Sequence, residues 1–244
     1  MKLIVLAAGY ATRLYPLTLD RPKPLLEVAG RPMLDRLLER VLAIGGIDET
    51  VIVTNGKFAG AFAEWAAGRP DIVVLDDGTT SEDDRLGAIG DIGFVLERRG
   101  IDDDVVVVAG DNLFGSDIAD FGDRARELDA PVLAVHDVGD LAEMAKYNEV
   151  QTDENGRITF FEEKPPNATT TLAGIALYFY PRSTLPLIRQ YLAEGNNPDQ
   201  PGRLIQWLYP RVPVFTWRVP GEWFDIGSRD SLAEADARFA GRDG

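Results

Sequence analysis

The sequence predicts an α/β fold in which a mixed, mostly parallel sheet is flanked by helices and followed by a smaller β-rich lobe. Two continuous apolar runs, at residues 2–7 and 104–109, are typical of strands buried on both faces of a parallel sheet. Strand and helix patterns alternate through residues 1–136, whereas residues 137–227 contain mostly short strands joined by polar turns. This change predicts two halves and a C-terminal helix at 228–240, all within a single domain at 1–240.

The first 75 residues predict the order strand, helix, strand, helix, strand. Apolar residues recur at three- and four-residue spacing from Met33 to Leu42, which predicts a helix that ends at the glycines at 45 and 46. The strands are expected at 2–7, 50–54 and 72–75, and the second helix at 58–67. Parallel strands joined by right-handed crossovers bind ligands beyond their carboxyl ends, so a ligand site is expected there.

The rest of the chain predicts elements of both kinds. Strands are expected at 104–109, 131–136, 147–151, 158–162, 172–180 and 212–219. Helices are expected at 86–98, after Asp117, at 183–194 with Ser183 as the cap, from Leu204, and at 229–239 with Ser228 as the cap. The Asn155-Gly156 step predicts a hairpin turn between two of the strands.

Composition excludes several classes of protein. The 244 residues include no cysteine, so disulfides, thiolate zinc sites and a cysteine nucleophile are excluded. The single histidine, His136, has no G-x-S-x-G partner motif and is interpreted as structural. No signal peptide and no apolar run of membrane-spanning length are found, which predicts a cytoplasmic protein with no membrane partner.

Charge is distributed unevenly along the chain. The formal net charge is −15, which argues against binding to nucleic acids or anionic membranes. Residues 1–31 nevertheless contain five Lys and Arg against two acids, a local charge of +3. A cationic opening in an acidic chain suits a small polyanion as the ligand.

A loop of small residues follows the first strand and leads into a cationic, proline-rich segment. Ala8 and Gly9 let a ligand approach the backbone closely, and free N–H groups in such a loop can hold phosphate oxygens. Arg13 offers a planar set of donors, and Lys23 offers a point charge. Three prolines between residues 16 and 24 restrict the backbone, so less ordering is needed on binding. The segment therefore predicts a phosphate site.

Residues 6–26 resemble the signature of the sugar-1-phosphate nucleotidylyltransferases, which include the glucose-1-phosphate thymidylyltransferases. That signature is L-A-G-G-x-G-[ST]-R-L-x-P-L-T followed by P-K-P-L, and Ala11 stands here in place of a glycine. The resemblance implies a Rossmann-like sheet and catalytic roles for Arg13 and Lys23. The nucleotide-binding residues that it implies, including a polar segment after the third strand, are Leu6, Ala8, Gly9, Thr12, Thr79, Thr80 and Gly87.

Two aspartates are candidate metal ligands. Asp111 follows the most hydrophobic strand, and a carboxylate in that place is costly unless it meets a cation or hydrogen-bond donors. Gly110-Asp111-Asn112 resembles the family's G-D-[NH] motif, and the segment from Trp223 to Gly227 resembles its W-x-D-[IT]-G motif. The resemblance implies that Asp111 and Asp225 bind Mg²⁺.

A third motif implies an acceptor site. Residues 161–165 resemble the family's E-E-K-P motif, in which the lysine, here Lys164, holds the sugar phosphate and the preceding Glu163 accepts a sugar hydroxyl. Asn148 stands where the family usually has glycine after a tyrosine. The complete set implied for sugar-phosphate binding is Asn112, Tyr147, Asn148, Glu163, Lys164 and Gly174.

These motifs imply transfer of a nucleotidyl group from a nucleoside triphosphate to a sugar-1-phosphate, with release of pyrophosphate. The attacking phosphate oxygen is already ionised, so positioning and charge neutralisation suffice and no general base is needed. On this interpretation residues 1–136 bind the nucleotide and residues 137–227 bind the sugar.

Three alternatives remain at this stage. They are a cytidylyltransferase for phosphocholine, a phosphonate or a polyol phosphate, a non-catalytic nucleotide-sensing homologue, and a nicotinamide-dependent oxidoreductase. The last is disfavoured because the glycines of a dinucleotide fingerprint are missing. The nucleobase, the acceptor and the oligomeric state are left open, although members of the family commonly form homo-oligomers.

Overall fold

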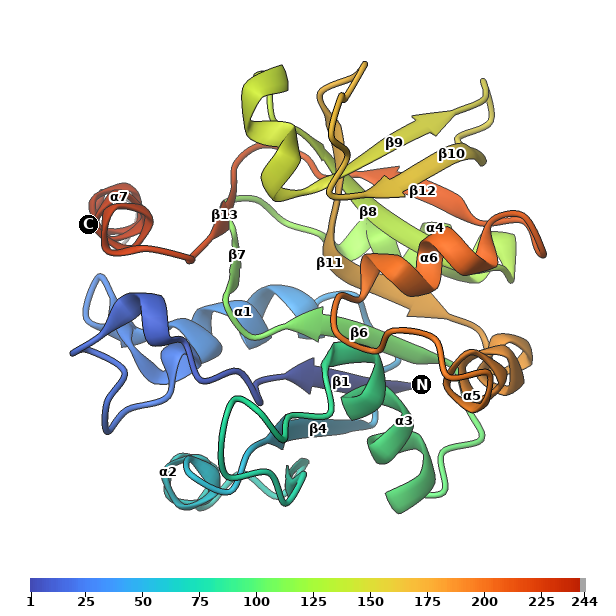
Figure 1. The fold of residues 1–244 in the computed structure, drawn as a ribbon. Helices are drawn as coiled ribbons and strands as arrows, with labels where there is room; N and C mark the ends of the chain where they lie inside the picture. Colours follow the sequence, from blue (N-terminus) through green and yellow to red (C-terminus); the bar gives the residue numbers. More distant parts are fainter. Residues whose placement is uncertain (242–244) are drawn as a thin grey trace. The chain divides into compact units, whose positions relative to one another are not determined.

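The computed structural model describes residues 1–241, and contacts divide the chain into two compact units. The N-terminal unit comprises Lys2–Arg85, Val108–Ala119 and 220–241, and the central unit comprises Met1, Leu86–Val107 and Asp120–Val219. Each unit combines strands and helices, so the mixed α/β class predicted from the sequence is confirmed (Figure 1). In the described part of the chain, no helix is both long and apolar enough to cross a membrane.

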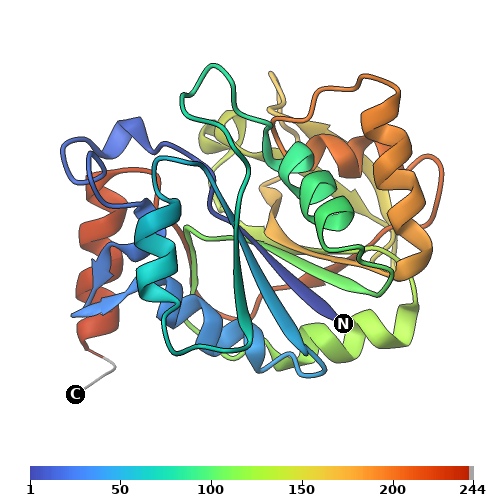
Figure 2. The same ribbon diagram turned by 90° about the horizontal axis from the view of Figure 1, so that it is seen from below.

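The N-terminal unit contains the predicted parallel strands. β1 (Lys2–Leu6) pairs in parallel with β4 (Glu49–Thr54), which pairs in parallel with β5 (Ile72–Asp76), and Figure 2 shows the three side by side. The connecting helices are α1 (Met33–Leu42) and α2 (Ala59–Trp65). The predicted order of strand, helix, strand, helix, strand is therefore confirmed.

Shorter elements complete this unit. The cationic loop contains two 3-10 turns, η1 (Thr12–Leu14) and η2 (Lys23–Leu25). β7 (Asn112–Phe114) pairs antiparallel with β13 (Trp223–Asp225), which the sequence did not predict. β2 (Glu27–Val28) pairs with β3 (Arg31–Pro32), and the chain ends in α7 (Arg229–Ala240). Ser228 caps α7 as predicted, because its side chain accepts a hydrogen bond from the N–H of Ser231.

The central unit has a mixed sheet with the strand order β12-β8-β11-β6. These strands are β6 (Val105–Ala109), whose last two residues belong to the N-terminal unit, β8 (Val132–Asp137), β11 (Leu172–Tyr180) and β12 (Phe215–Arg218). β11 runs antiparallel to β8, and β12 runs parallel to it. β9 (Asn148–Thr152) and β10 (Ile158–Glu163) form a separate antiparallel hairpin, as the Asn-Gly step predicts.

Helices and 3-10 turns accompany this sheet. They are α3 (Ala88–Arg98), α4 (Ala119–Leu128), α5 (Leu185–Ala193), α6 (Gly202–Leu208), η3 (Leu141–Lys146) and η4 (Arg182–Thr184). The prediction that Ser183 caps the fifth helix was wrong: the 3-10 turn η4 comes first, and α5 begins after Thr184 without a side-chain cap. The expected strand at 212–219 is also shorter and spans Phe215–Arg218.

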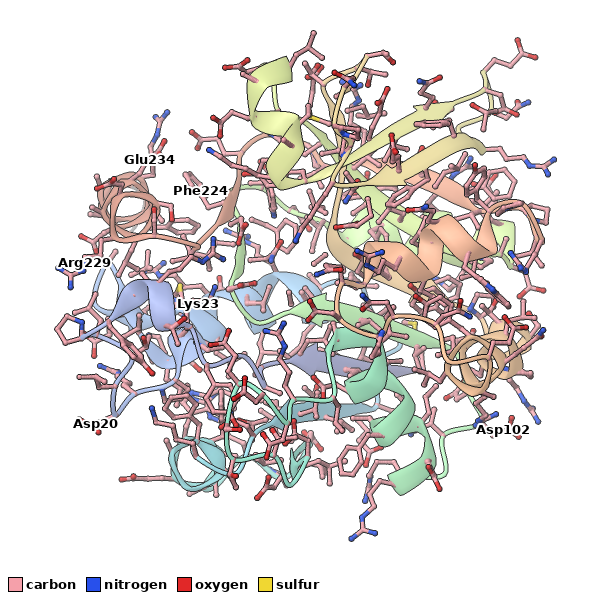
Figure 3. The ribbon with its side chains drawn as sticks, in the orientation of Figure 1. Asp20, Lys23, Asp102, Phe224, Arg229 and Glu234 are labelled. Atoms are coloured by element: carbon pink, nitrogen blue, oxygen red, sulfur yellow. The ribbon has the colours of Figure 1, made fainter. Side chains whose placement is uncertain are left out.

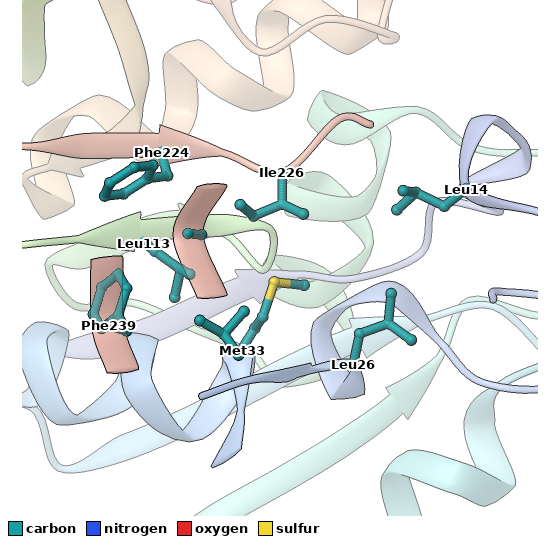
Figure 4. Packing of buried hydrophobic residues seen from close by; sticks show 9 residues of the cluster. Leu14, Leu26, Met33, Leu113, Phe224, Ile226 and Phe239 are labelled. Carbon is teal, nitrogen blue, oxygen red and sulfur yellow. The ribbon is translucent and has the colours of Figure 1, made fainter. Parts of the chain in front are cut away.

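A compact apolar cluster lies in the N-terminal unit (Figure 4). It is built from segments far apart in the sequence, namely the cationic loop, β2, α1, β7, β13 with the residue after it, and α7. Its buried members are Leu14, Leu26, Val28, Met33, Leu113, Phe224, Ile226, Ala235 and Phe239. Their burial removes apolar surface from water, which is the main favourable contribution to folding, and ties these segments together. The cluster therefore fixes the loop relative to the β7–β13 pair.

Candidate active site

Lys23 and Asp111 form the centre of the candidate site. The Nζ of Lys23 lies 2.5 Å from Oδ2 of Asp111 and donates to the carbonyl oxygen of Ile226 at 2.8 Å. The Lys23 side chain is only 14% exposed, and Figure 3 shows it inside the N-terminal unit, with Asp20 and Arg229 at the periphery. Burial opposes ionisation of Asp111, but its ion pair with Lys23 and its hydrogen bonds hold its pKa below the usual range.

Asp225 lies beside this pair. It is the register partner of Asn112 in the β7–β13 ladder, and the N–H of Ile226 donates to the carbonyl oxygen of Asp111 at 3.1 Å. Loss of solvent around its carboxyl group and the negative charge of Asp111 raise the pKa of Asp225 to about 6, although Lys23 and Arg13 act in the opposite direction. The two predicted metal ligands are therefore close enough to repel each other.

Apolar residues of the cluster are direct sequence neighbours of Arg13 and Asp225. Arg13 directly precedes Leu14, and Asp225 lies between Phe224 and Ile226. In a strand, successive side chains point to opposite faces, so burial of Phe224 turns the neighbouring Asp225 away from the cluster. Burial of the cluster thus orients the side chain of Asp225 and fixes the position of Arg13 in the chain.

A cavity of about 230 Å³ opens within the N-terminal unit beside Arg13, Lys23 and Asp111, and Asp225 is not among its lining residues. It is lined by six of the predicted site residues, namely Leu6, Gly9, Thr12, Arg13, Lys23 and Asp111. Tyr10, Glu82 and Arg85 also line it, and the sequence did not single them out. A larger cavity of about 860 Å³ in the same unit touches Glu49 and Ile72, where β4 and β5 begin, and contains no predicted site residue.

The remaining nucleotide-binding candidates have structural partners. Both the N–H and the Oγ1 of Thr79 donate to Asp77, and the N–H and Oγ1 of Thr80 donate to Asp84. Gly87 lies in the central unit at φ +80°, where an added Cβ would come within 2.8 Å of Asp199. These contacts shape the two segments, and a direct role in nucleotide binding stays a prediction.

Two alanines in the loop between β1 and η1 have contrasting backbone environments. Ala11 adopts a left-handed conformation with φ 49° and ψ 42°, which costs an alanine roughly 1–2 kcal/mol. Thr18 Oγ1 donates to the carbonyl oxygen of Ala11 at 2.8 Å and supports this turn. Ala8 is held differently, because the buried Asn55 side chain donates to its carbonyl oxygen at 2.8 Å.

The predicted acceptor residues form a second group in the central unit. The N–H of Lys164 donates to the carbonyl oxygen of Tyr147 at 2.9 Å, and Asn148 is hydrogen-bonded to Gly174. Burial raises the pKa of Glu163 to about 7, although Lys164 acts in the opposite direction. One Glu163 oxygen, Oε2, is buried without a hydrogen-bond partner within residues 1–241.

Asn112 differs from the other acceptor candidates, because it lies in the N-terminal unit. Its Nδ2 donates to Asp111 at 2.9 Å, and its Oδ1 accepts a hydrogen bond from Nε1 of Trp223 at 2.6 Å. The carboxamide therefore orients Asp111. Two side chains of the central unit near Glu163 were missed from the sequence: Gln206 Oε1 accepts from the Glu163 N–H at 3.1 Å, and Arg203 lowers the Glu163 pKa.

An α/β fold with cationic side chains and carboxylates beyond the ends of parallel strands is the arrangement of phosphate-binding α/β proteins. The chain belongs to the nucleotidyl transferase family, whose model matches residues 2–241.

Individual relatives agree with this membership. The chain is 28% identical to a Synechocystis UTP–glucose-1-phosphate uridylyltransferase over 93% of its own length and 60% of that protein. It is 29% identical to the uridylyltransferase AglF of Haloferax volcanii, with 98% and 96% of the two chains covered. A crystal structure of UDP-glucose pyrophosphorylase with UDP-glucose shares the fold with a TM-score of 0.81 at 19% identity, covering 99% and 98% of the chains.

Proposed function

We propose that the chain transfers a nucleotidyl group from a nucleoside triphosphate to a sugar-1-phosphate, giving a nucleotide sugar and pyrophosphate. The observation that carries this proposal is the convergence of Lys23, Asp111 and Asp225 within the N-terminal unit. The family and the uridylyltransferases that the chain resembles support the same chemistry. Because a nucleoside triphosphate would be the donor, we also propose a cytoplasmic location.

The donor set fits Mg²⁺. Loss of solvent and, after it, the negative charge of Asp111 raise the pKa of Asp225, even though Lys23 acts in the opposite direction. Within residues 1–241 no group of three or more His, Cys, Asp and Glu could hold a metal ion. Two carboxylates completed by water and phosphate oxygens suit Mg²⁺, which keeps several waters and binds with its substrate. When bound, Mg²⁺ would neutralise charge on the triphosphate.

The side chains of the N-terminal unit hold the nucleotide. Arg13, with its planar guanidinium, binds the departing pyrophosphate, and Lys23 donates to the α-phosphate, where negative charge develops. Small residues at Ala8 and Gly9 let the phosphates approach the backbone; a Cβ at Gly9 would meet no atom within 4 Å. The α-phosphorus then accepts an oxygen from the acceptor phosphate while its bond to the pyrophosphate oxygen breaks.

The side chains of the central unit hold the acceptor. Lys164, which is exposed, binds the sugar phosphate. Glu163, the residue before Lys164, binds a sugar hydroxyl. No proton transfer from the acceptor is needed, because its phosphate oxygen is already ionised.

A matrix of nucleoside triphosphates against acceptors tests this proposal. Five triphosphates are combined with several sugar-1-phosphates, phosphocholine and a polyol phosphate, in the presence of Mg²⁺, and pyrophosphate release is measured. We expect release with at least one sugar-1-phosphate. Release with CTP and phosphocholine alone supports the cytidylyltransferase alternative, and no release with any pair contradicts the proposal.

A further inference from the structure

Asn148 makes a contact that the proposed reaction does not use. It is the first residue of β9 and is buried, with 7% of its surface exposed. Its Nδ2 donates to the carbonyl oxygen of Gly174 at 3.0 Å, and its Oδ1 accepts the N–H of the same residue at 2.6 Å. Both ends of the carboxamide are therefore bound to the main chain of β11.

This double hydrogen bond takes the place of a strand pairing. β9 and β10 form a two-stranded sheet of their own, and β11 belongs to the larger sheet of the central unit. In a regular antiparallel ladder, two facing residues exchange an N–H and a C=O, and the Asn148 side chain offers Gly174 the same pair of groups. It thereby fixes both the distance and the rotation of the hairpin relative to β11.

Gly174 lies where this support is needed. Its register partner in β8 is Val135, but the next paired residue of β11 is Tyr178, so the ladder is irregular between the two. An added Cβ at Gly174 would lie 2.9 Å from Oδ1 of Asn148 and 2.6 Å from a methyl group of Leu133. The two residues are thus packed as a matched pair that leaves no room for a larger side chain.

The other acceptor residues depend on the same hairpin. Glu163 is the register partner of Asn148 in the β9–β10 ladder. The N–H of Lys164 donates to the carbonyl oxygen of Tyr147, the residue before Asn148. Lys164 itself has φ +52°, an uncommon conformation for a residue with a side chain, so its direction depends on the surrounding hydrogen bonds.

We propose that Asn148 is a positioning residue for the acceptor. Its carboxamide holds the β9–β10 hairpin on Gly174, so that Glu163 and Lys164 face the sugar phosphate in a fixed arrangement, and the carboxamide does not itself bind the sugar. This inference rests on the proposed function, because it concerns the acceptor of that reaction. It differs from the expectation of a direct sugar contact at residue 148.

The variant Asn148→Asp tests the proposal with almost no change in size. A carboxylate oxygen would replace Nδ2 opposite the Gly174 carbonyl, so a donor–acceptor pair becomes two facing acceptors. We expect the KM for the sugar-1-phosphate to rise roughly tenfold, which corresponds to about 1.4 kcal/mol, while the KM for the nucleoside triphosphate changes less than twofold. A rise of both KM values by the same factor, or a loss of thermal stability alone, overturns the proposal.

Asn55→Asp is the matched control. Asn55 is a fully buried amide of the N-terminal unit that also binds the main chain at two points, Ala8 O at 2.8 Å and the N–H of Phe58 at 3.2 Å. Ala8 lies in the loop after β1 that is proposed to hold the triphosphate. The Asn55→Asp variant is therefore expected to raise the KM for the triphosphate and to leave the KM for the acceptor nearly unchanged. The same KM pattern in both variants would indicate general destabilisation and overturn the proposal.

A second variant separates positioning from direct contact. Asn148→Gly removes the carboxamide without introducing a charge, and it serves also if Asn148→Asp does not fold. If Asn148 only positions Glu163 and Lys164, the KM should rise by a similar factor for every member of a series of deoxy-sugar-1-phosphates, because both residues lose their fixed arrangement. A direct contact predicts no rise for the one deoxy-sugar that lacks the contacted hydroxyl, and that result overturns the proposal.

Amide hydrogen exchange provides a readout that does not need activity. The Gly174 N–H should be protected in the unmodified protein and should exchange at least tenfold faster in Asn148→Gly, since its acceptor is removed. Unchanged exchange overturns the proposed link even if the enzyme is active. If the unmodified protein releases no pyrophosphate with any pair but the Gly174 amide responds, the proposed function fails while the structural link stands.

Discussion

Replacement of Lys23 by methionine is the most direct test of the nucleotide site. Methionine keeps most of the length of the side chain and removes the ammonium group, which contacts Asp111 Oδ2 at 2.5 Å and Ile226 O at 2.8 Å. The expected result is a large loss of rate with a moderate loss of stability. These two effects can be calculated separately because they depend on different contacts.

The loss of rate follows from transition-state electrostatics. A preorganised donor at a position where charge develops is worth about 2.7–4 kcal/mol, and each 1.36 kcal/mol changes a rate about tenfold. We therefore expect kcat to fall by about 100- to 1,000-fold. The loss of stability should lie between the roughly 1 kcal/mol of an exposed pair and the 3–5 kcal/mol of a fully buried one, because 14% of the Lys23 side chain and 26% of the Asp111 side chain are exposed.

The assay is pyrophosphate release at saturating substrates, accompanied by urea unfolding of each variant. Arg21→Gln is the matched control, since Arg21 lies in the same loop and forms an exposed ion pair with Glu27 at 3.2 Å. We expect this control to keep kcat within twofold of the unmodified protein. A Lys23→Met enzyme that is folded and retains more than a third of the original kcat would refute the assigned role.

Three further predictions test other parts of the site. Ala11→Gly should stabilise the protein by about 0.5–1 kcal/mol, because glycine adopts the left-handed conformation of residue 11 without strain. Ala8→Gly is the control and should destabilise the protein, because φ at residue 8 is not positive. Urea unfolding that shows the opposite change in stability for either variant would contradict this prediction. Asp225→Asn should raise the Mg²⁺ concentration that gives half-maximal activity by about tenfold or more. An unchanged Mg²⁺ titration would exclude a role for Asp225 as a metal ligand. Because the pKa of Glu163 is raised to about 7, its contribution to the free energy of unfolding is complete below about pH 4.5 and is lost as the pH rises to 7, by at most about 3 kcal/mol. Glu163→Gln should therefore flatten the dependence of stability on pH between 4.5 and 7. The same slope in the variant and the unmodified protein would contradict this prediction.

The parts of the fold that follow from local pattern were predictable from the sequence. The apolar run of β1 and the three- and four-residue spacing of α1 each report the environment of a single element, and both elements lie where the sequence places them. Asp111 was also identifiable, because a carboxylate after a buried strand needs a compensating partner. The sequence could not identify that partner as Lys23, which lies 88 residues earlier.

The parts that could not be predicted depend on contacts between distant residues. β13 pairs with β7 over a separation of more than 100 residues, and neither segment has a strand pattern long enough to be recognised alone. The N-terminal part of α5 was misplaced because the serine at 183 has the composition of a cap, whereas the chain there forms a 3-10 turn. The carboxamide of Asn148 has no sequence pattern at all, since its partner is a main-chain peptide in another strand.

The two groups of site residues are therefore held by different means. In the N-terminal unit, burial of the cluster orients Asp225 through its neighbours Phe224 and Ile226, and hydrogen bonds from Lys23 and Asn112 hold Asp111. In the central unit Glu163 is held through strand pairing to Asn148, whose side chain is bound to Gly174. If Glu163 and Lys164 bind the acceptor as proposed, a change at residue 148 is expected to affect acceptor binding more than nucleotide binding. Under the proposed function, a substitution at residue 148 would then change the preferred acceptor while Lys23, Asp111 and Asp225 are kept.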